Sequence, residues 1–381
     1  MKKTRLLSLG IAIVLVVGVF VGCAPAAAPT PPAAPPPPAA APAPGGSDDA
    51  NDSEVDLSQL RIGFAQDTLG QPWRAYQAES VRVMGEVYGI NIEITDGMAS
   101  NEGQIANIED MVTRGLDLLI SSPFQQAALT PHIANVYQSG IPVVLIDRGI
   151  GNRYFTSYIS SDNVDIGRSL VDFVGNAIIE RHGEPVGYIV VIDTVPGSAS
   201  SIQRNEGVWD QLEQYWPGIT VLDMQPAENN RALAISVMED FLQAHDRIDG
   251  VISLSDESTM GAILAIEASG RRDEMAIVSI NATMEALQAV IDGRIDLTVL
   301  YSNAAGAGVE IALQILRGER VPQRIILDPV LFTVENAAEF WEADRFSPDP
   351  MRLNQFTYIY FWEYDPENPP PRDQANYSAN R

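Results

Sequence analysis

The chain has 381 residues, of which 46% are apolar, so it is long enough to bury the cores of two ordinary domains. The formal net charge is −26, and removal of the first 22 residues would leave 21 basic against 50 acidic residues, or −29. Because so acidic a surface repels phosphate backbones and anionic lipid headgroups, the composition argues against nucleic acid as a partner.

The amino terminus has the pattern of a processing signal. Residues 1–5 are basic, residues 6–21 are almost wholly apolar, and Gly22 precedes Cys23, the only cysteine in the chain. A small residue before a lone cysteine at the end of such a segment resembles the bacterial lipobox. This resemblance implies a lipoprotein signal peptide at 1–22, cleavage before Cys23 and lipidation of its sulfur. The mature fold then contains no disulfide.

The residues after Cys23 have the composition of a spacer. Residues 24–46 are mostly Ala and Pro, and 47–54 form an acidic run. Such a segment cannot bury a core and favours extended polyproline II backbone. We therefore predict a linker at 23–57 that holds a folded domain away from a membrane surface.

The folded part begins with alternating strands and helices, which apolar runs and apolar residues at helical spacing predict respectively. The elements expected in the first half are strands at 60–66, 90–95, 116–121, 141–146 and 156–160, with helices at 73–88, 101–114 and 125–138. Repeated β-α-β units with right-handed crossovers give one parallel sheet with helices on both faces.

The alternation starts again near Asp162. The elements expected there are strands at 186–192, 219–224, 250–254, 276–280 and 295–300, with helices at 162–181, 201–215, 229–243, 257–269 and 304–317. We therefore predict an α/β fold with two doubly wound parallel sheets. The pattern fades after about Val334, and we expect the aromatic residues at 340–341 and 356–362 to pack on a domain. Residues 365–381 have the composition of a loose terminus.

One predicted strand ends in two opposite charges. The run Gly140-Ile-Pro-Val-Val-Leu-Ile-Asp147-Arg148 is a turn and a strand without a polar atom, followed by an acid and an arginine. Ligands of open α/β sheets bind outside the carboxyl ends of such strands, so this pair is a candidate ligand contact. An ion pair between the two, or a cap of the next turn, explains the residues equally well.

Several stretches match a known family in the same order along some 270 residues. They are Ile62-Gly-Phe-Ala65, Gln71-Pro72-Trp73, 107–117, 140–148, Ser161-Asp162-Asn163 with Gly167, 196–199 with Arg204 and Gly207, and 237–245. Together they resemble the ribose- and galactose-type periplasmic binding proteins, the type I sugar-binding components of ABC importers. The resemblance covers residues 60 to about 330.

The resemblance implies two lobes joined by a three-segment hinge, with a sugar held between them. The boundaries that we expect on this basis are 58–160 plus 302–328 for the N-terminal lobe, 161–301 plus 329–345 for the C-terminal lobe, and 346–381 for a C-terminal extension. Clefts between lobes are common sites for small ligands, which agrees with this expectation.

The resemblance also implies a set of ligand-binding residues. Asp147 and Arg148 match a hydroxyl-binding pair, and Trp73 matches a ring-stacking aromatic. The remaining contact positions are Asp67, Gln71, Arg74, Ser122, Asn229, Ser255, Asn281 and Tyr301. From spacing alone, Trp73 fits the core side of an amphipathic helix better than a ligand contact, and Asn281 also fits a cap for a helix beginning at Thr283.

Some positions depart from the ribose binders. Ile202 replaces an arginine, Asn229 and Ile280 replace aromatics, and Asn281 replaces an aspartate. The Trp73-Arg74 pair is similar to the galactofuranose-binding subgroup. These departures imply a sugar other than ribose.

The sequence contains no catalytic triad, Walker loop, dinucleotide motif or metal-ligand spacing at a useful position, so we expect neither an enzyme nor a cofactor or metal. The resemblance implies an extracytoplasmic, lipid-anchored monomer that delivers a small carbohydrate to ABC permease subunits. A sugar-sensing receptor for a chemotaxis or histidine-kinase partner is the alternative. A transcription regulator of the same fold needs a basic DNA-binding segment at the amino terminus, where this chain has a signal and a Pro-Ala linker.

Overall fold

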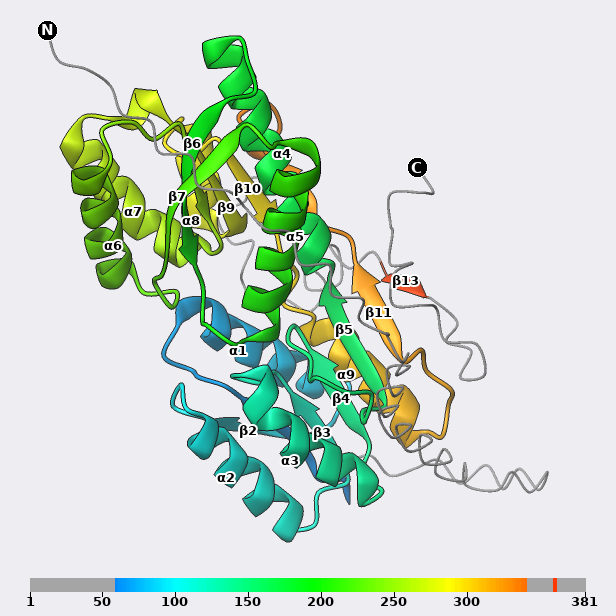
Figure 1. Ribbon diagram of the computed structural model, residues 1–381. Helices are drawn as coiled ribbons and strands as arrows, with labels where there is room; N and C mark the ends of the chain where they lie inside the picture. The colour runs from blue at the N-terminus through cyan, green and yellow to red at the C-terminus, as the bar shows by residue number, and fades with distance from the viewer. Residues whose placement is uncertain (1–58, 341–358, 362–381) are drawn as a thin grey trace, which may run out of the picture. The chain divides into compact units, whose positions relative to one another are not determined.

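The computed structural model of the protein describes residues 59–340 and 359–361 (Figure 1). Within these ranges, none of the helices is long and apolar enough to cross a membrane. The predicted signal peptide, Cys23 and the whole of the predicted linker lie outside the described residues, as do Trp341, 356–358 and Trp362. The structure therefore bears on the folded body of the chain.

The first sheet has seven strands in the spatial order β13-β11-β5-β4-β3-β1-β2. The strands are β1 (Ile62–Gln66), β2 (Ile92–Asp96), β3 (Leu118–Ser121), β4 (Val143–Ile146), β5 (Ser157–Ser161), β11 (Arg324–Leu327) and β13 (Ile359–Phe361). All neighbours are parallel except β11 and β13. One face carries α1 (Pro72–Val87) and α9 (Ala305–Leu316), and the other carries α2 (Asn101–Thr113) and α3 (Gln126–Gln138).

The second sheet has six strands in the order β12-β10-β9-β8-β6-β7. The strands are β6 (Gly187–Asp193), β7 (Ile219–Pro226), β8 (Gly250–Ser253), β9 (Ala276–Asn281), β10 (Leu297–Leu300) and the antiparallel edge strand β12 (Val330–Phe332). One face carries α4 (Asn163–His182) and α5 (Ala199–Tyr215). The other carries α6 (Arg231–Ala244), α7 (Asp256–Ser269), α8 (Met284–Ile291) and the short α10 (Ala337–Phe340).

From β5 to β12 the chain passes between the two sheets at three places, and at β13 it is again part of the first sheet. It leaves the first sheet after β5, returns after β10 to form α9, and leaves again between β11 and β12. Two mostly parallel sheets with helices on both faces, joined in this way, confirm the predicted fold class.

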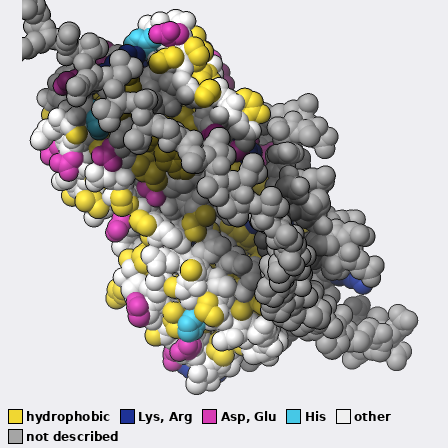
Figure 2. Space-filling model, viewed as in Figure 1, with side chains coloured by type: hydrophobic (Ala, Val, Ile, Leu, Met, Phe, Trp, Pro, Cys, Tyr) yellow, Lys and Arg dark blue, Asp and Glu magenta, His cyan; other side chains and the backbone are white. Residues whose placement is uncertain are grey.

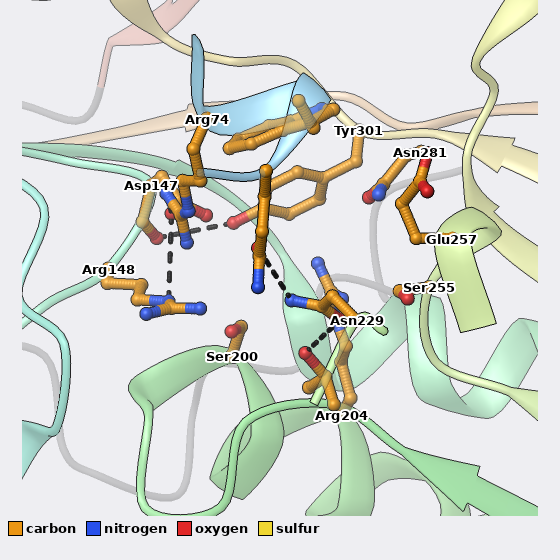
Figure 3. A pocket seen from close by; sticks show the side chains of 13 residues that line it. Arg74, Asp147, Arg148, Ser200, Arg204, Asn229, Ser255, Glu257, Asn281 and Tyr301 are labelled. Carbon is orange, nitrogen blue, oxygen red and sulfur yellow. Dashed lines mark hydrogen bonds and ion pairs between the residues drawn. The ribbon is translucent and has the colours of Figure 1, made fainter. Parts of the chain in front are cut away.

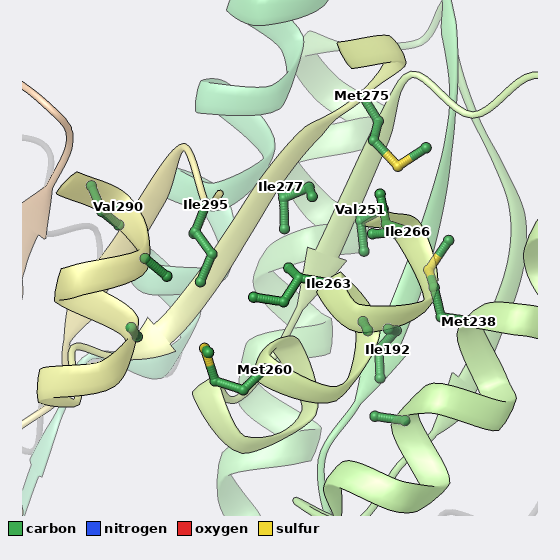
Figure 4. Close-up of a cluster of buried hydrophobic side chains, with 14 of the residues drawn as sticks. Ile192, Met238, Val251, Met260, Ile263, Ile266, Met275, Ile277, Val290 and Ile295 are labelled. Carbon is green, nitrogen blue, oxygen red and sulfur yellow. The ribbon is translucent and has the colours of Figure 1, made fainter. Parts of the chain in front are cut away.

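Buried apolar strands explain why the sequence shows runs rather than alternation. All residues of β3, β4, β8 and β10 are buried, since helices cover both faces of each sheet. In the second sheet, side chains from β6, β8 and β9 pack against α6, α7 and α8, with Ile192, Ile263 and Ile277 at the centre (Figure 4). This packing fixes the strand ends on which the candidate site is built.

Most element boundaries agree with the sequence expectations to within a few residues, but five short elements were missed: β11, β12, β13, α10 and the 3-10 helix Arg272–Glu274. The strands β11 and β12 have four and three residues, which is too short for a clear periodicity signal. The helix α10 has four residues. Its last residue, Phe340, packs against Phe332 with ring centroids 5.0 Å apart, so this member of the expected aromatic group does contact a core.

Acidic side chains are spread over the visible face of the molecule rather than gathered at one place (Figure 2). Many of them are paired with arginine, as in the exposed pairs of Arg114 with Glu93 and Asp110. Exposed pairs of this kind contribute little to stability. On the face that Figure 2 shows, the negative charge is therefore not gathered into one patch.

Candidate functional site

A pocket lies where the carboxyl ends of strands from both sheets meet (Figure 3). The residues that line it are Gln71, Trp73, Arg74, Asp147, Arg148, Thr194, Ser200, Arg204, Asn229, Ser255, Glu257, Asn281 and Tyr301. The cavity that these side chains enclose measures only about 30 Å³, so little space is left between the two sides of the pocket in this structure. Its lining is mostly polar, which suits a ligand rich in hydroxyl groups.

Strand ends position most of these side chains. Asp147 and Arg148 follow β4, Thr194 follows β6, Asn229 follows β7 and Ser255 follows β8. Asn281 ends β9, and Tyr301 follows β10 at one of the crossings between the sheets. Parallel strands deliver their carboxyl ends to one edge, so side chains distant in sequence converge there.

Two buried aspartates and two buried arginines form the first-sheet side of the pocket. Arg74 Nη1 donates to Asp147 Oδ2 at 2.5 Å, and Arg74 Nε lies 3.2 Å from Asp67 Oδ1. Arg148 Nη1 donates to the other oxygen of Asp67, Oδ2, at 2.8 Å. Ser122 donates its hydroxyl to Asp147 Oδ2 at 3.0 Å. All four charged side chains are at most 5% exposed, so each charge depends on its partners.

This network sets the charge states in the pocket. Burial alone would raise the pKa of the Asp147 carboxyl, but the guanidinium groups of Arg74 and Arg148 hold that pKa below its usual range. Burial raises the pKa of Tyr301 well above its usual value, and the charge of Asp147 adds to the effect. At neutral pH the pocket thus offers a carboxylate acceptor and a neutral tyrosine hydroxyl.

Three of the lining residues have left-handed backbone conformations. The φ angles are 64° at Asp147, 57° at Asn229 and 129° at Asn281. Asp and Asn tolerate this region better than other residues with a side chain, but the conformation still costs free energy. Such strain gathers at functional sites, and here each instance turns a polar side chain at a strand end toward the pocket.

Four stacked side chains run across the pocket from one sheet to the other. Arg74 lies over the Trp73 ring, 4.9 Å from its centroid, and the centroids of Trp73 and Tyr301 are 5.9 Å apart. Arg204 lies over the Tyr301 ring, 4.6 Å from its centroid. Cation–π contacts of this kind are strongest when desolvated, as these are. Trp73 is half-buried and packs against the second-sheet core, so its core role and its place in the pocket coexist.

Amide groups connect the two sides of the pocket directly. Gln71 Nε2 donates to the backbone carbonyl of Glu228 at 3.1 Å, and Asn229 Nδ2 donates to Gln71 Oε1 at 3.5 Å. Thr194 donates its hydroxyl to Asn229 Oδ1 at 2.6 Å. Because Gln71 belongs to the first side and the other residues to the second, these bonds exist only when the two sides are close.

The structure brings nine of the eleven predicted site residues to the lining of the pocket. Asp67 and Ser122 lie behind it, where they hold Arg148, Arg74 and Asp147. The capping alternative for Asn281 is wrong, because Thr283 caps α8 with its own side chain. Ser255 lines the pocket and also caps α7.

Distance argues against a local ion pair between Asp147 and Arg148. Arg148 Nε and Asp147 Oδ2 are 3.9 Å apart, which is too long for a hydrogen bond. Asp147 instead has its short contact with Arg74 of α1, and Arg148 has its short contact with Asp67 in the loop between β1 and α1. The two neighbours therefore do not form a self-contained ion pair.

Four lining residues were missed as site residues from the sequence: Thr194, Ser200, Arg204 and Glu257. Arg204 lies inside a stretch that carries the family resemblance, and Glu257 stands two residues after the predicted contact Ser255. The sequence therefore contained an indication that both residues lie near the site. Ser200 belongs to the first turn of α5, whose approach to the pocket only the fold reveals. Ile202, two residues after Ser200 in α5, is 48% exposed and does not line the pocket.

In the described ranges, 59–340 and 359–361, no group of three or more His, Cys, Asp or Glu side chains could hold a metal ion. Glu257, the acid on the far side of the pocket, is held by Arg231 through contacts of 2.7 and 3.1 Å. The chemistry that this arrangement offers is hydrogen bonding and stacking around a small polar molecule.

Comparison with known proteins assigns the chain to a family. Residues 62–320 match the family described as the periplasmic binding protein domain. The ribose import binding protein of Salmonella typhimurium is 27% identical over 274 residues, which cover 71% of this chain and 90% of that protein. The galactofuranose-binding protein of Escherichia coli is 27% identical over 297 residues, which cover 75% and 92%.

Solved structures agree with this assignment. The fructose-binding periplasmic domain of a hybrid two-component system superposes with a TM-score of 0.69 at 30% identity, covering 74% of this chain and 93% of that domain. These relatives are binding proteins, which confirms the expectation that the chain is not an enzyme. With the matched stretch spanning both sheets, this chain belongs to the periplasmic binding protein family, as its sequence resemblance predicts.

Proposed function

We propose that this protein captures a small carbohydrate between its two sheets and delivers it to an ABC importer. The observation that carries the proposal is the pocket in which Arg74, Asp147 and Arg148 form one buried network opposite polar residues of the second sheet. The names of the relatives support the import role, since one of them is a ribose import binding protein.

The lining suits a sugar chemically. A sugar hydroxyl both donates and accepts hydrogen bonds, so it can donate to the Asp147 carboxylate while it accepts from Arg148 or Arg74. The Trp73 ring offers an apolar face for the carbon side of the sugar ring. Asn229, Ser255 and Asn281 offer further donors and acceptors from the opposite side. In this proposal the ligand contacts are the eleven residues predicted from the sequence, with Asp67 and Ser122 acting through their neighbours.

The kind of sugar that we propose is not ribose. Trp73-Arg74 stands where the family stacks aromatics, and a galactofuranose-binding protein is among the relatives. The exposed Ile202 provides no guanidinium for a ribose hydroxyl. A furanose form of a hexose or pentose fits both observations.

We propose that binding closes a hinge between the segments 58–160 plus 302–328 and 161–301 plus 329–345. The sheet membership of β11 and β12 supports this division. The ligand gains contacts from both lobes only when they are close, so it shifts the population toward the closed form. The bonds of Gln71 to Glu228 and Asn229 stabilise the same form.

We further propose that the mature protein begins at Cys23 and is a monomer held by a lipid at the outer face of the membrane. The support is the lipobox-like Gly22-Cys23 and the Pro-rich linker that follows it. Globomycin treatment of expressing cells tests this point: an uncleaved precursor is expected, and cleavage that continues unchanged contradicts it.

A calorimetric titration with a panel of pentoses, hexoses and furanose sugars tests the central proposal. Binding of at least one sugar is expected, with ribose weaker than the best ligand. If no sugar binds while a nucleoside or amino acid binds tightly, the carbohydrate proposal fails.

A sensory role is the second candidate, because a solved structure similar to this chain is the periplasmic domain of a two-component system. Genes beside this one distinguish the two roles. Permease and ATPase genes favour import, whereas a histidine kinase gene favours sensing.

A further inference from the structure

A second cavity lies beside the first pocket and shares none of its lining residues. Its volume is about 300 Å³. The loop from β4 to β5, the first residues of α3 and the start of β11 form one side, and Ala199 and Gln203 of α5 form the other. The cavity is thus built from both sheets, as the first pocket is.

The lining of this cavity differs in charge from the rest of the protein. The whole chain has 50 acidic and 24 basic residues. Among the described residues that line the cavity there are two arginines, Arg153 and Arg324, and four amide side chains, but no Asp or Glu. The walls between these groups are the rings of Phe155 and Tyr158.

Arg324 has unused hydrogen-bonding capacity in this position. Its guanidinium lies over the Tyr158 ring, 4.0 Å from the centroid, and its Nη2 donates to Ser160 Oγ at 3.2 Å. In the part of the chain that the structure describes, it forms no ion pair with a carboxylate. A guanidinium has five N–H donors in a planar fork that matches a carboxylate or phosphate group. The hydrogen bond to Ser160 uses one of these donors.

We propose that this cavity binds a small organic anion. The carboxylate or phosphate group lies on Arg324, amide side chains bind its remaining oxygens, and the body of the molecule packs against Phe155 and Tyr158. The volume limits the ligand to about the size of a monosaccharide or a di- or tricarboxylic acid. Binding at this site does not depend on the carbohydrate proposal.

The anion site has a structural connection to the first pocket. Tyr158 donates its hydroxyl to the backbone carbonyl of Asp147 at 3.1 Å, and Asp147 has a left-handed conformation. Next to the cavity, the backbone N–H of Gln126, on the side of the first sheet, donates to the carbonyl of Gly197, on the side of the second sheet, at 2.9 Å. An anion that contacts both sides therefore favours their approach, and by linkage it raises the affinity of the first pocket for its sugar. This coupling, unlike the site itself, rests on the proposed function.

Calorimetric titration of the full mature chain with citrate and with inorganic phosphate tests the anion site, with sodium chloride at matched ionic strength as the control. Saturable binding of one probe is expected, and the probe that binds identifies the group. Arg324→Gln should weaken binding about tenfold or more, because it removes a charge-assisted hydrogen bond. Arg324→Lys, which keeps the charge without the fork, should give an intermediate loss, and Arg82→Gln, at an exposed arginine on α1, should give none.

Two results contradict the proposal. One is the absence of binding beyond the effect of sodium chloride, and the other is equal binding by Arg324→Gln and the parent protein when both show the same thermal unfolding. Asp147→Asn separates this site from the first pocket, since it should retain anion binding while it loses sugar binding. Failure of the anion site thus leaves the sugar titrations standing.

Discussion

Arg148 makes its short contact with Asp67, 81 residues away in the sequence, rather than with its neighbour Asp147. Its Nη1 is 2.8 Å from Asp67 Oδ2, whereas its Nε is 3.9 Å from Asp147 Oδ2. Asp147 is held instead by Arg74. The crossed pairing gives each of the four charges a partner of opposite sign, while Asp147 and Arg148 still line the pocket.

Asp147→Asn should weaken sugar binding by about 1.5–3 kcal/mol, because a charge-assisted acceptor for sugar hydroxyls becomes a neutral one. The amide keeps the shape of the side chain, so the left-handed backbone is tolerated. Calorimetry with the best sugar from the panel measures the change. Asp110→Asn, at an exposed carboxylate of α2, is the matched control and should bind as the parent does. Unchanged affinity in Asp147→Asn means that Asp147 only supports the fold.

Arg74→Lys should lower both stability and affinity. The guanidinium reaches Asp67 through Nε and Asp147 and Ser122 through Nη1, and an ammonium group cannot make these contacts together. The expected loss in the free energy of unfolding is about 1–3 kcal/mol, because a buried carboxylate is left poorly paired. Urea unfolding measures it. Arg82→Lys, on the same helix but exposed, should change little, and equal losses in the two variants contradict this account.

Tyr301→Phe should separate the two roles of Tyr301. It removes the hydroxyl that donates to the Asp147 carbonyl at 3.2 Å, but it keeps the ring between Trp73 and Arg204. Since Tyr158 donates to the same carbonyl, the expected cost in stability is only about 0.5–1.5 kcal/mol. Tyr301→Ala should cost distinctly more, because it also removes the stacked ring. If the Phe and Ala variants are equally destabilised, stacking contributes nothing.

Asp256 should lower the free energy of unfolding as the pH rises, whereas a carboxylate that is paired with a cation in the folded state raises it. Burial raises its pKa from 3.8 to about 6, although Ser279, Thr283 and Thr298 donate hydrogen bonds to it. The folded state therefore binds this proton more tightly than the unfolded state does. The stabilisation is fully present below about pH 4 and is lost as the pH rises through about 6, a change of roughly 3 kcal/mol.

Asp256→Asn isolates this effect from the other carboxyl groups. The free energies of unfolding of the parent and the variant, measured in urea at pH 4.5 and 7.5, should differ by an amount that changes with pH. The parent should lose stability relative to the variant at the higher pH. A difference that is the same at both pH values contradicts the raised pKa.

Much of the fold could be predicted from the sequence because its signals are local. Strands buried on both faces, such as β4, appear as apolar runs, and helices such as α2 carry apolar residues on one side. The short strands β11 and β12 gave no such signal, since three or four residues show no period. Only their pairing with β5 and β10 defines them.

The part of the site that could be predicted consists of residues at the carboxyl ends of strands. Asp147, Ser255 and Asn281 stand at carboxyl ends that the sequence pattern locates. The partners of these residues could not be predicted, because the crossed pairing of Arg148 with Asp67 depends on the strand order, in which β3 lies between β1 and β4. Arg204 was missed because it belongs to a helix and reaches the pocket by stacking on Tyr301.

A crystal structure of the protein with the best sugar from the titrations tests the central claim most directly. We predict that the sugar lies between the two sheets, with hydroxyls within hydrogen-bonding distance of the Asp147 carboxylate and the Arg148 guanidinium and a ring face on Trp73. A sugar bound elsewhere, or bound between the sheets without contact to Asp147 and Arg148, contradicts it.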